Sequence, residues 1–105
     1  MTVTLPQAHP LLLIDYRQRA GMNALEASKA SRIGVTTLAT AERGALAIMG
    51  GRLHSLARVY GCKASDLVAD DPKTLDKELA AYKRDCPPHR ARISVQQWRA
   101  DNAAE

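Results

Sequence analysis

Residues 21–44, with the sequence GMNALEASKASRIGVTTLATAERG, constrain the fold of this chain more than any other stretch. A glycine stands at each end, where a helix commonly stops. Asn23 can cap a helix over about 24–31, because its side chain can accept from a backbone N–H of the first turn. Residues 32–34 leave room only for a tight turn before a second helix over about 35–43. The stretch therefore predicts two short helices packed across a turn.

The composition favours helices throughout the chain. Phe is absent and aromatic residues make up only 4% of the sequence, so the core must be built from Leu, Ala, Val, Ile and Met. Such a core suits small, closely packed helices. No run alternates β-branched or aromatic residues for long, so strand signals are poor. We predict an all-α chain.

Three parts are expected along the chain. Residues 1–8 form a flexible leader, in which Pro6 discourages regular structure. Residues 9–70 form a helical domain, and residues 71–105 form a helical tail. Besides the two helices above, the spacing of apolar residues and caps predicts helices at about 10–20, 52–60, within 62–70, at 73–85, and after Ser94.

Positive charge is concentrated in the helical domain. Residues 1–68 hold eight Lys or Arg against four acidic residues, whereas residues 69–105 hold seven of each. Two short helices across a tight turn are the layout of a helix-turn-helix, whose second helix enters the DNA major groove. The excess charge lies where phosphate binding would require it. A basic surface with no partner is the simpler alternative.

Enzymatic, metal-binding and membrane classes have little support in the sequence. No glycine-rich phosphate loop follows a strand, and we expect no catalytic residue and no cofactor. His54, Cys62, Cys86 and His89 match no metal-site spacing, so no metal is expected. No stretch is long and apolar enough to span a membrane, and no secretory signal is visible. These features predict a cytoplasmic protein that is not an enzyme.

Several residues of the two-helix stretch recur at the spacing of one known family. The matching positions are Gly21, Met22, Asn23, Ala27, Ser28, Ile33, Leu38, Glu42, Arg43 and Gly44, and residues 56–68, LARVYGCKASDLV, are similar to the family's closing segment. In these positions the chain resembles the lambda-repressor-like, Cro-type (XRE family) helix-turn-helix domain. The resemblance implies a five-helix lambda-repressor-like domain, followed here by a helical C-terminal extension, that binds double-stranded DNA.

The resemblance assigns positions on the second helix of the pair to the DNA bases. Leu38 and Ala41 should face the core, and four residues should face the bases: Val35, Thr36, Thr37 and Thr40. Threonine hydroxyls can bond many base edges, and their methyl groups suit thymine methyls. No Arg or Gln lies on this face, so readout should depend partly on DNA shape. The expected DNA backbone contacts are Asn23, Arg32, Arg43 and Arg52.

The sequence departs from the family at the turn and keeps one structural pair. Arg32 stands where the family has a glycine, so it must change the turn or tolerate a left-handed backbone. Ala24 stands where the family has a glutamine that contacts phosphate, and Gly34 replaces the usual serine cap. Arg17 and Glu42 match two positions that form an ion pair in relatives. The resemblance therefore implies an Arg17–Glu42 pair between the first helix and the end of the third.

Apolar residues of the tail predict a dimer interface. Leu75, Leu79 and Tyr82 form a stripe on one helix, and Val95 and Trp98 share a face of the next. With the apolar loop 45–49, they exceed what a five-helix core should bury, and excess apolar surface usually finds a partner. The alternative is a tail that folds back on its own domain and leaves a monomer.

Together these features predict a small bacterial, phage or plasmid transcriptional regulator. We expect a repressor that binds an inverted-repeat operator as a homodimer. One alternative is an antitoxin that binds its own promoter and neutralises a toxin with its tail. Another is a module that uses the same surface for a protein partner rather than for DNA.

Overall fold

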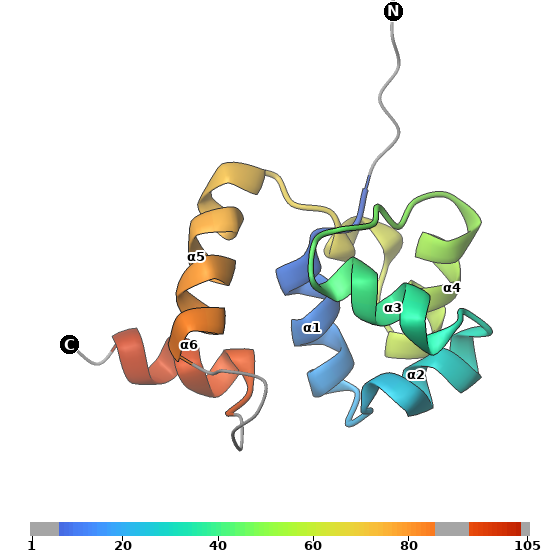
Figure 1. Ribbon diagram of the computed structural model, residues 1–105, viewed down its shortest axis with the longest axis horizontal. Helices are drawn as coiled ribbons and strands as arrows, with labels where there is room; N and C mark the ends of the chain where they lie inside the picture. The colour runs from blue at the N-terminus through green and yellow to red at the C-terminus, as the bar shows by residue number, and fades with distance from the viewer. Residues whose placement is uncertain (1–6, 86–92, 104–105) are drawn as a thin grey trace, which may run out of the picture.

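The computed structural model describes residues 7–85 and 93–103; residues 1–6 of the expected leader lie outside this part (Figure 1). The elements are α1 (Pro10–Arg19), α2 (Ala24–Ser31), α3 (Val35–Glu42), α4 (Gly51–Tyr60), a 3₁₀ helix η1 (Ala64–Leu67), α5 (Pro72–Asp85) and α6 (Val95–Ala103). In these two ranges the only β-type pairing consists of isolated bridges from Gln7 to Met49 and from Ala8 to Val68. The described part of the chain is all-α, as predicted.

Local capping signals set the helix ends, which agree with the predicted ones to within one residue. His9 caps α1, its ring Nδ1 accepting from the backbone N–H of Leu11 at 3.1 Å. Asn23 caps α2 in a reciprocal capping box with Glu26. Gly61 ends α4 with a φ of 71°, a left-handed conformation that costs glycine little.

Helix α1 is shared by two hydrophobic cores. It packs against α3, α4 and η1, and also against α5 and α6. Figure 1 shows α5 and α6 on one side of α1 and α2 to α4 on the other. Leu13 enters the core with α2 to α4, while Leu11 and Ile14 enter the core with α5 and α6. The tail is therefore attached to the domain through α1.

The first core includes residues that the sequence analysis placed elsewhere. Ala8, assigned to the leader, is buried, and its N–H donates to the carbonyl of Ile48 at 2.8 Å. Ile48, assigned to a surplus apolar loop, is fully buried. Residues 45–47 of that loop remain exposed. The first core thus includes Ala8 and uses Ile48 of the α3–α4 loop.

The second core corrects the predicted dimer interface. Leu79, Tyr82, Val95 and Trp98 are buried against α1 of the same chain, with Leu75 packed at the margin. The rings of Tyr82 and Trp98 meet edge to face with centroids 5.7 Å apart. These side chains are not available to a second chain, because α1 presents Leu11 and Ile14 to them. The tail folds back on its own domain, which was the alternative.

A buried carboxylate adds specificity to this packing. Asp15 on α1 is fully buried and accepts hydrogen bonds from Arg19 at 2.9 and 3.0 Å and from Gln96 of α6 at 3.0 Å. Arg99 of α6 reaches Asp15 at 3.4 Å and also donates to Glu78 of α5 at 2.6 Å. A buried charge is tolerated only when it is paired and hydrogen-bonded. This network therefore fixes how α6 sits on α1 and α5.

Candidate nucleic-acid interface

The turn between α2 and α3 is held in a left-handed conformation. Arg32 has φ 61° and ψ 26°, and it is the one non-glycine residue with positive φ in the described part of the chain. Ser28 Oγ donates to the carbonyl of Ile33, and Ser31 Oγ donates to the carbonyl of Ala27 at 2.7 Å. Ile33 is buried beneath the turn. These contacts hold Arg32 in the left-handed conformation, one of the two outcomes that the sequence left open at this position.

Helix α3 buries one face and exposes the other. Leu38 and Ala41 face the core, as predicted. Val35, which is 41% exposed, and Thr36 lie on the outer face, whereas Thr37 is half-buried. Of the four predicted base-facing positions, the two at the start of α3 are therefore the most accessible.

Thr40, the fourth position, is partly engaged by its own helix. Thr40 is half-buried as a residue, and its hydroxyl donates to the carbonyl of Thr36 at 2.7 Å and accepts from Arg43 Nη2 at 3.2 Å. Its hydrogen is thus already used, so in this geometry Thr40 offers a ligand only an acceptor lone pair and its methyl group.

Glu42 is the single acidic residue of α3, and Arg17 neutralises it. Arg17 Nε and Nη2 donate to the two carboxylate oxygens of Glu42 at 2.7 and 3.0 Å, and Nη1 donates to the carbonyl of Met22 at 3.0 Å. Both side chains are largely buried, 12% and 11% exposed. Burial acts to lower the pKa of Arg17, but the hydrogen bonds and charge of Glu42 raise it above its ordinary value. The pair implied by the resemblance is present, and it leaves the outer face of α3 without negative charge.

Tyr60, at the end of α4, carries a buried hydroxyl that this pair influences. Burial raises the pKa of the Tyr60 hydroxyl well above its ordinary value, and the negative charge of Glu42 raises it further. Tyr60 itself is 7% exposed and belongs to the first core.

The N-terminus of α2 already has an anion of its own. Asn23 Oδ1 accepts from the Glu26 N–H at 2.8 Å, and Glu26 Oε1 accepts from the Asn23 N–H at 3.0 Å. A helix N-terminus attracts phosphate through such N–H groups. The carboxylate of Glu26 occupies the Asn23 N–H and adds a negative charge at this helix end. This geometry therefore weakens the expected Asn23–phosphate contact.

Exposed basic residues lie before and after α3 along the chain. Arg32 lies in the turn before it, Arg43 follows its last residue, and Arg52 lies in the first turn of α4; all three are exposed. The structure adds Lys83 of α5, whose Nζ donates to the carbonyl of Arg43 at 3.2 Å. No sequence pattern links Lys83 to α3, because the contact depends on how the tail packs on α1.

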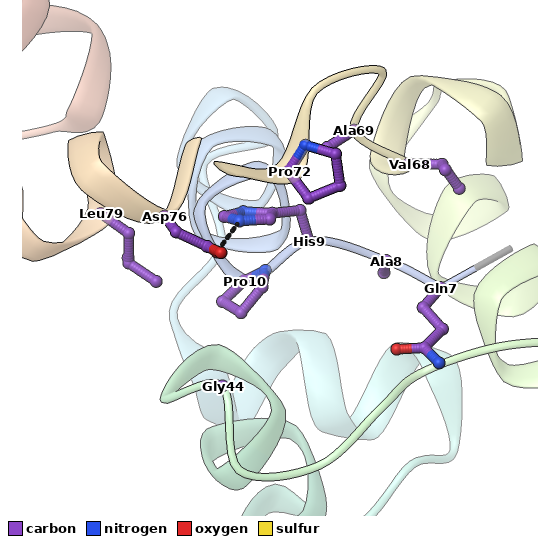
Figure 2. A pocket seen from close by; sticks show the side chains of 10 residues that line it. All are labelled: Gln7, Ala8, His9, Pro10, Gly44, Val68, Ala69, Pro72, Asp76 and Leu79. Atoms are coloured by element: carbon purple, nitrogen blue, oxygen red, sulfur yellow. Dashed lines mark hydrogen bonds and ion pairs between the residues drawn. The ribbon is translucent and has the colours of Figure 1, made fainter. Parts of the chain in front are cut away.

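A pocket of about 560 Å³ lies where the tail meets the domain (Figure 2). Its lining includes Gly44 just after α3, and Pro72, Asp76 and Leu79 of α5. His9 is 6% exposed, and its Nε2 lies 2.8 Å from Asp76 Oδ1. The titratable groups of the pocket thus bind each other, as expected of a joint between two parts of a fold.

Two further properties concern only the described residues. Among them, no group of three or more His, Cys, Asp or Glu side chains could hold a metal ion; Cys86 and His89 lie outside them. None of the helices described is both long and apolar enough to cross a membrane.

Comparison of the chain with known protein families, with curated proteins and with solved structures finds no match.

Proposed function

We propose that this chain is a small cytoplasmic transcriptional regulator, not an enzyme, that inserts α3 into the major groove of double-stranded DNA. One observation carries the proposal. The outer face of α3, exposed at Val35 and Thr36, is free of negative charge, because Arg17 binds and buries the helix's only carboxylate, that of Glu42. A neutral face with exposed basic residues before and after it along the chain suits a groove between two rows of phosphates.

The arrangement of helices supports a lambda-repressor-like domain. Helices α1 to α4 and η1 give five helical elements within residues 10–67, the number that the Cro-type resemblance implies. Helices α2 and α3 pack directly against each other across the three-residue turn. In such a domain α2 crosses the DNA backbone and positions α3 in the groove.

The accessible residues divide between bases and phosphates. Val35 and Thr36 are the principal base contacts, with apolar contacts to thymine methyls and one flexible hydroxyl. Thr37 and Thr40 contribute less, because both are half-buried. Arg32, Arg43 and Arg52 bind phosphates, and these contacts set the register of α3 in the groove without reading sequence.

A homodimer on an inverted repeat remains part of the proposal, because one recognition helix reads only a few base pairs. Its interface must lie outside the tail core. Leu46, 39% exposed within the apolar run 45–47, is the best candidate. Sedimentation should give a mass of two chains, and Leu46→Glu should reduce it to one; a mass of one chain for the unmodified protein would remove the dimer from the proposal.

Selection of bound duplexes from a random pool tests DNA binding directly. Thr36→Ala should weaken binding to the selected duplex by about 1 kcal/mol or more and leave binding to unrelated duplexes unchanged. Arg52→Ala should weaken binding to both alike, with a shallower salt dependence. No enrichment of any sequence, with binding that does not respond to salt, would refute the proposal.

An antitoxin that autoregulates its promoter is a weaker alternative. Such a protein neutralises its toxin with an arm that orders on the partner, whereas α5 and α6 pack on α1 through buried Tyr82 and Trp98. Limited proteolysis separates the two. Rapid removal of the tail from the isolated protein would favour the antitoxin, or another protein partner.

A further inference from the structure

Lys83 of α5 contacts the end of α3 from a distant part of the sequence. Its Nζ donates to the backbone carbonyl of Arg43 at 3.2 Å, and both residues are exposed. In Figure 1 the last turn of α3 lies on the side of the molecule that carries α5. A residue of the tail thus reaches the border of the candidate DNA-binding face.

The packing of the tail sets this position. Leu79 and Tyr82 of α5 are buried against α1, and Tyr82 Oη accepts from Gln18 Nε2 at 3.2 Å. These contacts fix the rotation of α5 about its axis. Lys83, next to Tyr82, is therefore placed toward α3 by buried neighbours.

Two exposed basic residues come together after the last turn of α3, because Lys83 Nζ lies at the backbone carbonyl of Arg43. Arg43 Nη2 reaches Thr40 Oγ1 at 3.2 Å, which keeps the guanidinium along the outer face of the helix. Nearby carboxylates are engaged elsewhere: Glu42 by Arg17, and Asp85 by the indole N–H of Trp98 at 2.9 Å. In the described part of the chain, neither Arg43 nor Lys83 forms an ion pair.

The C-terminus of α3 accounts for one cation but not for an exposed pair. Helix C-termini carry a partial negative charge that attracts a single Lys or Arg. The second exposed basic side chain adds positive charge at this helix end, which a polyanion could neutralise. A DNA phosphate that follows the end of a helix in the groove would supply the neutralising charge.

We propose that Lys83 is an additional phosphate contact, so that the tail extends the DNA-binding surface beyond the end of α3. This inference rests on the proposed function, since it requires α3 to lie in the groove. It makes the docked tail part of the DNA-binding unit. In the simpler alternative, Lys83 only stabilises the end of α3.

Salt-dependent DNA binding separates the two roles. The probe is a duplex selected from a random pool by the unmodified full chain, and the variants are Lys83→Gln, Lys83→Arg and Lys77→Gln. Lys77 is an exposed lysine of the same helix, so its variant controls for net charge and helix propensity. Each loss of a phosphate contact should reduce the slope of log affinity against log salt by about 0.9.

The expected result is a shallower slope for Lys83→Gln alone. The affinity of Lys83→Gln divided by that of the unmodified chain should rise about threefold to fourfold when salt increases from about 50 mM to about 200 mM. Lys83→Arg should retain the original slope. Equal slopes for Lys83→Gln and Lys77→Gln, with steep salt-dependent binding by the unmodified chain, would overturn this inference and leave the proposed function standing. Absence of duplex binding by the unmodified chain would overturn both.

Discussion

Gln18 and Val95 are joined by a hydrogen bond of 2.8 Å, in which the first backbone N–H of α6 donates to Gln18 Oε1. The amide nitrogen of the same side chain donates to Tyr82 Oη of α5 at 3.2 Å. One glutamine of α1 therefore contacts both tail helices. It also satisfies one of the N–H groups that a helix start leaves without an internal partner.

Replacing Gln18 should loosen the tail. Gln18→Leu leaves the Val95 N–H without its acceptor and removes the link to Tyr82, so we expect the free energy of unfolding to fall by about 1–2 kcal/mol. Proteolysis within α5 and α6 should accelerate. Gln97→Leu changes an exposed glutamine of α6 and serves as the control. Equal proteolysis rates for the two variants would contradict the capping role.

The Arg17–Glu42 pair should contribute strongly to stability. Glu42→Gln leaves a largely buried guanidinium without its counter-charge and should cost about 3 kcal/mol in urea unfolding, whereas Arg17→Met combined with Glu42→Leu should cost less. The pKa of Arg17 is raised, so its contribution is complete below the unfolded value and is lost only as pH rises through the folded one. The loss of unfolding free energy in Glu42→Gln should therefore be equal at about pH 6 and about pH 9. A difference between the two would show that Arg17 is not its source.

Helix positions were predictable because their signals are local. Asn23, Gly61 and Ser94 act through the turn in which they lie, and the structure uses each at a helix end. The direction of α3 also followed from its sequence, since Leu38 and Ala41 share one face.

The partner of the tail could not be predicted in the same way. An apolar stripe such as Leu75, Leu79 and Tyr82 shows which side chains become buried, but the stripe is the same whether the cover is α1 or a second chain. The decision depends on Leu11 and Ile14, which give α1 a second apolar side. The cationic contact of Lys83 was hidden for the same reason, because it follows from that packing.

Acid should loosen the first turn of α5 through Asp71. A hydrogen bond from the Thr74 hydroxyl, 2.6 Å long, is the main cause that lowers the pKa of the Asp71 carboxyl below its ordinary value. A lowered pKa means that this stabilisation is present above the ordinary value and is lost as pH falls through the folded one. Below about pH 4, amide chemical shifts at residues 71–74 should therefore move toward unfolded values. Asp71→Asn should abolish that transition; its persistence in the variant would assign it to another group.

Arg32→Gly should change stability and DNA affinity in opposite directions. Glycine takes the left-handed conformation of Arg32, φ 61°, without strain. The free energy of unfolding, measured by thermal denaturation, should therefore rise by about 0.5–1 kcal/mol. Loss of the guanidinium should weaken duplex binding and reduce its salt slope by about 0.9. Arg32→Asn, which also tolerates this conformation, is the matched control. A variant that gains stability and keeps its salt slope would show that Arg32 touches no phosphate.

Glu26→Gln should lower stability and strengthen DNA binding, the reverse of Arg32→Gly. The amide oxygen of glutamine can keep the hydrogen bond from the Asn23 N–H, now 3.0 Å, but the favourable charge at the start of α2 is lost, so stability should fall by about 0.3–1 kcal/mol. If phosphate approaches this helix end, removing the negative charge should strengthen duplex binding about two- to threefold at low salt. Screening should erase most of the gain near 1 M salt. Unchanged affinity at low salt would place the DNA backbone away from α2, leaving Arg32, Arg43, Arg52 and Lys83 as the proposed phosphate contacts.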